Sequence, residues 1–196
     1  MSSYYATASF QEKGGFMFRY DTKLWFDKPA RKEEGVCVGA VLGLNPGSSA
    51  PAEEPGVATV DQTMGCILRA FETAASSLGK TLPKNAFVRM WNLMYLCDSN
   101  QGSAIEVWLR HPEFATGDYL DPTESQAAPF VWFAWTASAP IGLAVRALSR
   151  HEPACWLGMD GKPHFGRPDL LAVRHPSRKG IALLASVVEP MLRAVL

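Results

Sequence analysis

Three short segments of this chain carry side chains that could take part in chemistry. The first is the loop Gly43-Leu44-Asn45-Pro46-Gly47, whose glycines allow close backbone approach and whose proline fixes a turn. The Asn45 carboxamide can orient a water molecule or hydrogen-bond a polar ring, but it is no strong base. Composition alone favours a plain Asn-Pro turn. No Gly-Lys-Ser/Thr follows, so the loop is not a nucleotide P-loop.

The second segment is an apolar run, Met90–Met94, that contains a single amide, Asn92. A buried amide without a hydrogen-bond partner costs about 1–3 kcal/mol, so Asn92 needs a partner. Two interpretations are equally good. Asn92 is either a structural amide satisfied by a neighbouring loop or a bidentate amide that reads the edge of a ligand.

The third segment is His175-Pro176-Ser177, which follows an apolar stretch and precedes a helical pattern. Its surroundings are basic, with Arg167, Arg174, Arg178 and Lys179. An ordinary solvated basic surface is slightly favoured, and a lone histidine is more often structural than catalytic. The alternative is a loop that holds an anion or a polar ligand. His164, in Pro163-His164-Phe165-Gly166, is the weaker candidate for the same role.

Asp61 lies at the start of a helical pattern, where a carboxylate can accept hydrogen bonds from the unpaired N–H groups of the first turn. We expect it to cap that helix. The chain has no His-Glu-x-x-His or Gly-x-Ser-x-Gly motif. Its four cysteines are widely spaced and form no Cys-x-x-Cys pair, so they predict buried free thiols in a reducing compartment. We therefore predict neither a metal site nor a cofactor.

The elements that position these residues alternate between strands and helices. Apolar runs predict buried strands over residues 36–44, 86–96, 130–135 and 155–159. Helical spacing of apolar residues predicts helices over residues 61–78, 103–110, 138–150 and 180–195. Residues 16–26 indicate two short strands around Asp21-Thr22, a small N-terminal hairpin.

This alternation implies an α/β fold with a parallel sheet covered on both faces. Ligands of such sheets bind outside the carboxyl ends of the strands. The rule points to four places, which are Asn45–Ser49, Asn92 with its successors, Trp135–Ser138 and the segment around His175.

The size and composition of the chain favour one domain over residues 1–196. It has 196 residues, 47% of them hydrophobic and 19% charged, which is typical of a globular chain. No signal segment opens it and no apolar run approaches ~20 residues, so we expect a cytoplasmic protein that does not enter a membrane. The formal net charge of zero lacks the basic footprint usual for nucleic-acid binding.

The ordered motifs of the chain resemble those of a bacterial domain-of-unknown-function family, the one numbered sixteen forty-three. The matching segments cover roughly residues 15–175 and run in the family's order: Phe16–Phe26, Leu42–Pro46, Asp61-Gln62-Thr63, Trp91-Asn92-Leu93, Phe133-Ala134-Trp135 and Leu157–Pro163. No single one of these motifs is specific, whereas their ordered set is.

The same set is more remotely similar to the uracil-DNA glycosylase superfamily. Gly43–Gly47 is close to the first motif of its mismatch-specific branch, and His175-Pro176-Ser177 matches a common form of its second motif. The resemblance implies a three-layer α/β/α sandwich with a central, mainly parallel four-stranded sheet. It also implies an N-glycosylase, which would act in DNA repair, and a partner that is DNA or a small molecule containing a nucleobase.

The resemblance implies roles for individual residues. Asn45, His175 and Asp61 would be catalytic: Asn45 would position water, His175 would donate to a base oxygen, and Asp61 would supply a carboxylate. The base or ligand would be held by Gly43, Pro46, Gly47, Ser48, Asn92, Trp135, Ser177 and Arg178.

Several positions depart from the superfamily pattern. Position 45 is Asn where the uracil-specific branch has a water-activating Asp, and Gly47 replaces the bulky residue that excludes thymine there. No hydrophobic wedge follows Ser177, and His164 competes with His175 for the second motif. Two alternatives therefore stand beside the glycosylase: a non-catalytic binder of a nucleotide, modified base or nucleic acid, and a hydrolase of a small nucleoside.

Overall fold

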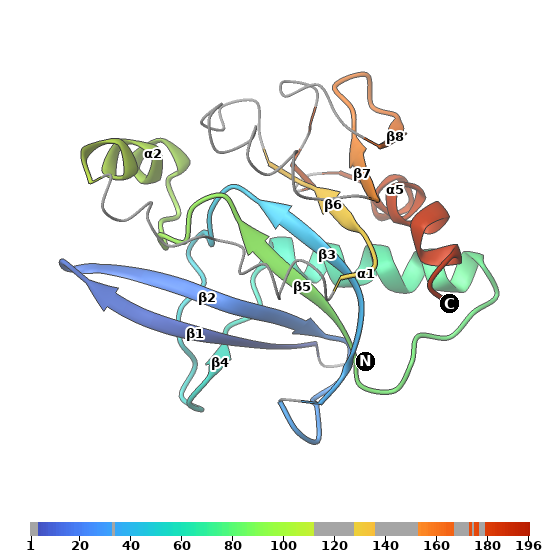
Figure 1. Cartoon of the computed structure of the whole chain (residues 1–196), viewed down its shortest axis with the longest axis horizontal. Coiled ribbons are helices and arrows are strands. Elements are labelled where there is room, and N and C mark those ends of the chain that lie inside the picture. Colours follow the sequence, from blue (N-terminus) through green and yellow to red (C-terminus); the bar gives the residue numbers. More distant parts are fainter. Residues whose placement is uncertain are drawn as a thin grey trace.

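A computed structural model describes residues 4–32, 34–111, 128–135, 153–166, 173, 175–176 and 179–196. Over these residues the chain forms one mixed sheet in the order β4-β1-β2-β5-β3-β6-β7-β8 (Figure 1). The strands are β1 (Tyr5–Lys13), β2 (Phe16–Trp25), β3 (Val36–Gly43), β4 (Val57–Ala58), β5 (Ala86–Asn92), β6 (Val131–Phe133), β7 (Ala154–Leu157) and β8 (Pro163–Phe165). The described helices are α1 (Gln62–Ser77), α2 (Gln101–Arg110) and α5 (Ile181–Arg193).

The expected sandwich around a mainly parallel four-stranded sheet is wrong. The sheet has eight strands and mixed pairing, and the described residues contain more strand than helix. β3 pairs in parallel with β5 and β6, and β6 with β7, whereas β2 joins β5 and β8 joins β7 in antiparallel pairs. The sheet is larger than expected at this edge because the N-terminal hairpin is part of it and is not a separate unit. Thr22–Trp25 of β2 pair with Phe87–Met90 of β5 and so extend the sheet.

The hairpin itself also turns at a different place from the one expected. Gly14 and Gly15 join β1 to β2 and have φ of 58° and 78°. Glycine adopts such positive φ values without steric cost, which allows the tight turn. Asp21 and Thr22 lie inside β2, where they oppose the single residue Ala8 between two regular stretches of the ladder. The segment that resembled a turn is therefore a β-bulge, in which Asp21 has a φ of 45°.

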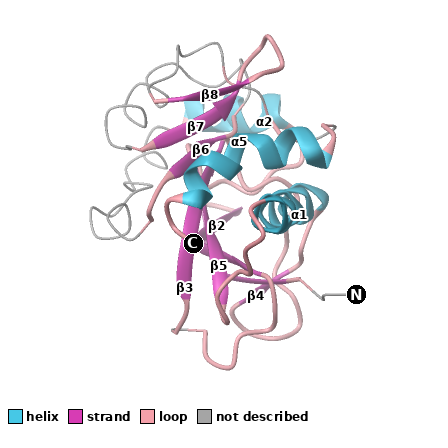
Figure 2. Cartoon of the chain, turned by 90° about the vertical axis from the view of Figure 1, so that its right-hand side faces the viewer, coloured by secondary structure: helices cyan, strands magenta, loops and turns pink. Residues whose placement is uncertain are grey.

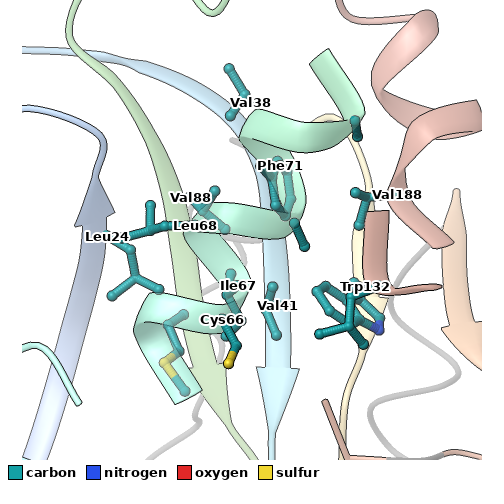
Figure 3. Packing of buried hydrophobic residues seen from close by; sticks show 14 of the residues in the cluster. Leu24, Val38, Val41, Cys66, Ile67, Leu68, Phe71, Val88, Trp132 and Val188 are labelled. Atoms are coloured by element: carbon teal, nitrogen blue, oxygen red, sulfur yellow. The ribbon is translucent and has the colours of Figure 1, made fainter. Parts of the chain in front are cut away.

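One face of the sheet is covered by α1 and α5, which lie against each other (Figure 2). The apolar stripe of α1 places Leu68 and Phe71 over Val41 and Val88 of the sheet, and Val188 of α5 joins the same cluster (Figure 3). The predicted helix over residues 61–78 is confirmed. Its start is capped by Asp61, and Gly79, with a φ of 64°, follows its last residues.

The other face carries a second, more aromatic cluster. Trp91, Phe133 and Trp135 are buried there, and Ala104 of α2 packs among them. The predicted helix over residues 103–110 corresponds to α2, and that over 180–195 corresponds to α5. The predicted helix over 138–150 lies outside the described residues.

The strands that matter for the site end side by side. β3 ends at Gly43 and β5 at Asn92, and parallel pairing places Gly43 opposite Asn92. The chain continues this contact, because Leu93 N–H donates to Gly43 O at 2.9 Å and Met94 N–H to Leu44 O at 2.8 Å. The loops after both strands therefore start from one edge of the sheet. Among the described helices, none has the length and apolar content needed to cross a membrane.

Candidate functional site

A cavity of about 430 Å³ opens at the carboxyl ends of β3 and β5. Its lining comes from four stretches of the chain: residues 43–47, the start of α1, Met90 on β5, and the loop that leads into α2. His175, close before α5, completes the lining. The cavity therefore occupies the strand-end position at which a parallel sheet is expected to bind ligands.

The structure brings the three predicted catalytic residues to this cavity. Asn45, Asp61 and His175 all line it, although they lie far apart in the sequence. Three of the predicted ligand-binding residues, Gly43, Pro46 and Gly47, also line it.

The other predicted binding residues lie elsewhere. Ser48 is exposed and is absent from the lining of this cavity in the described chain. Trp135 is fully buried in the aromatic cluster, where its ring lies 5.0 Å from that of Phe133. Ser177 and Arg178 lie outside the described residues.

The orientation of the Asn45 amide is fixed by a bond across the loop. Its Nδ2 donates to the backbone oxygen of Asp98 at 2.7 Å. A carbonyl oxygen only accepts, so the amide nitrogen must face it and Oδ1 is left to accept from a ligand. Asp98 in turn accepts from Asn100 N–H at 2.7 Å, and the Asn100 side chain caps α2 by accepting from Ser103 N–H at 3.1 Å. The Asn45 side chain is thus braced through the start of α2.

The Asp61 carboxylate has two different environments for its two oxygens. Oδ1 accepts from Met64 N–H at 2.8 Å and caps α1, as predicted. Oδ2 faces the loop, because a Cβ built on Gly47 would lie 4.0 Å from it. Gly47 has a φ of 67° and no side chain, so the loop leaves this oxygen open to the cavity. Asp61 can therefore cap the helix and still act on a ligand.

His175 is half-buried at the wall of the same cavity. Burial lowers its pKa below the usual value, and the negative charge of Asp61 opposes part of that shift. A histidine with a lowered pKa is neutral at pH 7. One ring nitrogen then donates a hydrogen bond and the other accepts one.

His164 lies on the β7–β8 hairpin and does not line the cavity. Its Nε2 lies 3.0 Å from Asp160 Oδ1, and its ring stacks on Trp156 with 5.4 Å between centroids. Of the two competing histidines, only His175 lies beside Asn45 and Asp61.

Asn92 lies behind the cavity wall and not on its surface. It shares a face of β5 with Met90, since alternate residues of a strand point to the same side. Gly43, its neighbour on β3, lines the cavity, and a Cβ built on Gly43 would lie 3.2 Å from Asn92 Oδ1. Asn92 is fully buried, and neither Oδ1 nor Nδ2 finds a hydrogen-bond partner within the described part of the chain. Of the two interpretations of Asn92, satisfaction by a neighbouring loop is thus not seen among the described residues.

Five further residues that the sequence reasoning missed line the cavity: Thr63, Met90, Asp98, Ser99 and Gln101. A signal for the last three was present, because Asp98-Ser99-Asn100-Gln101 is a polar run that follows the predicted strand at residue 96. Such a run after a buried strand marks the edge where ligands bind.

The four cysteines are free, as predicted, but only Cys66 and Cys155 are buried, whereas Cys37 and Cys97 are half-buried. Burial raises the pKa of Cys37, Cys97 and Cys155. Over the residues that the structure describes, no group of three or more His, Cys, Asp or Glu side chains is arranged to hold a metal ion.

Comparison of the chain with family models, with curated proteins and with solved structures finds no match in any of the three. The two resemblances drawn from the motifs remain predictions.

Proposed function

We propose that this cavity binds a nucleobase and that the protein hydrolyses the N-glycosidic bond between that base and its sugar. The observation that supports the proposal most is the meeting of Asn45, Asp61 and His175 at one cavity. Together they offer an amide oxygen, a carboxylate and a neutral imidazole. Hydrolysis of this bond needs an oriented water, a proton acceptor and a donor to the departing base.

In this mechanism Asn45 Oδ1 and the open oxygen of Asp61 hold a water molecule against the anomeric carbon. The new C–O bond forms as the C–N bond breaks, and the electron pair of the C–N bond leaves with the base. Asp61 accepts the proton of the water and then returns it to the departing base. His175 donates a hydrogen bond to a base oxygen, where negative charge develops. Asp61 thus supplies the carboxylate that position 45 lacks.

The size and charge of the cavity favour a small substrate. Its volume of about 430 Å³ falls in the usual range of roughly 300–1,000 Å³ for ligand sites. Two carboxylates, Asp61 and Asp98, line it, and no Lys or Arg does so among the described residues. A phosphate would be repelled there, so these carboxylates favour a free nucleoside over a nucleotide in DNA.

The test is a base-release assay on two panels of substrate. One panel holds single- and double-stranded oligonucleotides with uracil, hypoxanthine or modified cytosines, and the other holds the corresponding free nucleosides. Release of free base from either panel, lost in Asp61→Asn, supports the proposal. No release from any substrate at saturating enzyme would exclude hydrolysis.

Salt dependence separates the two kinds of substrate. Activity on DNA should fall steeply as salt rises, because phosphate contacts release counterions, whereas activity on a nucleoside should change little. Thermal stabilisation by nucleosides without any product would instead support the alternative of a non-catalytic binder.

A further inference from the structure

Arg19 is a buried cation that the mechanism above does not use. It lies on β2 and is 0% exposed, which makes it the one charged residue in the buried core of the described chain. Burial lowers the pKa of its guanidinium, and Cys97 and the Asp61 carboxylate raise it. Asp61 is therefore within electrostatic reach of Arg19.

The guanidinium has little to compensate its charge. Its Nη2 donates to Met90 Sδ at 3.7 Å, and a thioether sulfur is only a weak acceptor. Nε and Nη1 are buried and have no hydrogen-bond partner among the described residues. Proteins rarely bury a charge without a partner, since its lost hydration is not replaced. No described residue therefore supplies the strong hydrogen-bond partner that this guanidinium needs.

The position of Arg19 shows where such a partner would come from. Its neighbours Phe18 and Tyr20 pack into the aromatic cluster, so Arg19 points to the opposite face, the one that carries α1. Met90, which it contacts, lies on that face of β5 and lines the cavity. The thickness of one methionine side chain thus separates the guanidinium from the cavity.

We propose that Arg19 is the specificity-determining residue of the cavity and binds an oxygen of the nucleobase once Met90 moves aside. This inference rests on the proposed function and deepens it by naming the substrate class as oxo-bases, whose exocyclic oxygens take up negative charge. Arg19 then neutralises the charge that the departing base acquires.

The chemistry of the neighbouring groups fits a planar oxo-base. Nε and Nη1 are two donors on one rigid fork, which suits an oxygen that carries negative charge. Methionine has three rotatable bonds, so Met90 can change rotamer and leave its contact with Arg19.

The first experiment measures ligand binding and melting temperature for the wild type and Arg19→Met, with urate, uracil, adenine and inorganic phosphate as probes. We expect the wild type to be stabilised by urate and uracil and not by adenine, which has no oxygen. Arg19→Met should melt at the same or a higher temperature, because an uncompensated charge has gone, and should bind urate roughly tenfold or more weakly. Phosphate as the only stabilising probe would contradict the oxo-base.

Two other outcomes would overturn the inference. A large fall in melting temperature or a failure to fold in Arg19→Met would assign Arg19 a structural role. Unchanged urate binding in a folded Arg19→Met would remove it from the site.

A second pair of variants tests the path past Met90 without altering Arg19. Met90→Ala removes the side chain between the guanidinium and the cavity and should lower the Kd for urate. Met90→Leu keeps the volume and should leave the Kd equal or higher. Equal Kd values for these two variants would contradict the role of Met90.

The two proposals can fail separately. Base release that persists unchanged in Arg19→Met would support hydrolysis and contradict the role of Arg19. Oxo-base binding that needs Arg19, without any base release, would support the role of Arg19 and contradict hydrolysis.

Discussion

Two histidines of this protein lie close enough to an aspartate to be influenced by its charge, and their surroundings differ. His164 and Asp160 belong to one hairpin and are 41% and 48% exposed in their side chains. His175 and Asp61 come from distant parts of the chain and meet at a cavity, where burial lowers the pKa of the histidine. The Pro-His and His-Pro-Ser motifs around them made His164 only the weaker of two competing candidates.

The difference shows that the solvent around a histidine–carboxylate pair decides what it can do. Water screens the charges of the hairpin pair, which therefore acts as an ordinary surface contact. The pKa of Asp160 is lowered first by the bond from Lys162 N–H and then by His164, both local to the turn. At the cavity, burial lowers the pKa of the imidazole and keeps it neutral at pH 7.

The largest expected effect is that of Asp61→Asn on base release. Asparagine still caps α1, so folding is preserved, but it cannot accept a proton. We expect kcat to fall by roughly 10²–10⁴-fold in a free-base assay. Asp160→Asn is the matched control and should retain full activity. Equal losses in both variants would end the distinction between the two pairs.

The next effect is that of His175→Gln on the same reaction. Glutamine keeps a donor but places it less rigidly, so the support given to the departing base weakens. We expect kcat to fall by up to roughly 10²–10³-fold, the range for loss of one donor to a developing oxyanion. His164→Gln should leave kcat and KM unchanged. A loss of kcat confined to His164→Gln would indicate that the active site lies at the β7–β8 hairpin and not at the cavity.

A smaller effect is expected when the hairpin pair is disturbed on purpose. A Cβ at Gly158 would lie 2.4 Å from Asp160 Oδ1 and 2.6 Å from His164 Nε2. Gly158→Ala must therefore push the two side chains aside. We expect Tm to fall by no more than roughly 4 °C in thermal unfolding. Base release by the folded variant should match the wild type, and a strong loss of activity would link the hairpin to the cavity.

The smallest effect concerns pH. The pKa of His175 is lower in the folded protein than its usual 6.5, so the unfolded chain binds more protons in the interval between the two values. The contribution of His175 to stability is fully present above pH 6.5 and falls as the pH drops towards the folded pKa. Urea unfolding at several pH values should show this loss, and His175→Asn should reduce it. An identical pH profile in the variant would contradict a lowered pKa.

Much of the site followed from local patterns in the sequence. The apolar stripe of α1, with Asp61 before it and Gly79 after it, is a short-range signal and was predicted correctly. The strand-end rule brought Asn45 and His175 to the same edge because parallel strands all end there. These predictions needed no knowledge of which strands are neighbours.

The parts that were missed depend on contacts between distant residues. The pairing of β2 with β5 joins the hairpin to the sheet, and it is set by complementary faces that no local pattern displays. Asp98 reaches the cavity through its bond to Asn45, 53 residues away. The place of Asn92 beside Gly43 follows from sheet register and not from the apolar run around it.

The double use of Asp61 has a consequence for how α1 responds to a ligand. One oxygen caps the helix at Met64 N–H and the other faces the cavity. A proton or a bonded ligand at the open oxygen withdraws charge from the whole carboxylate and weakens its hold on that amide. Hydrogen exchange at Met64 would then speed up as the cavity fills, although Met64 itself is fully buried. The exchange rate of this amide in the first turn of α1 would thus report whether the cavity is occupied.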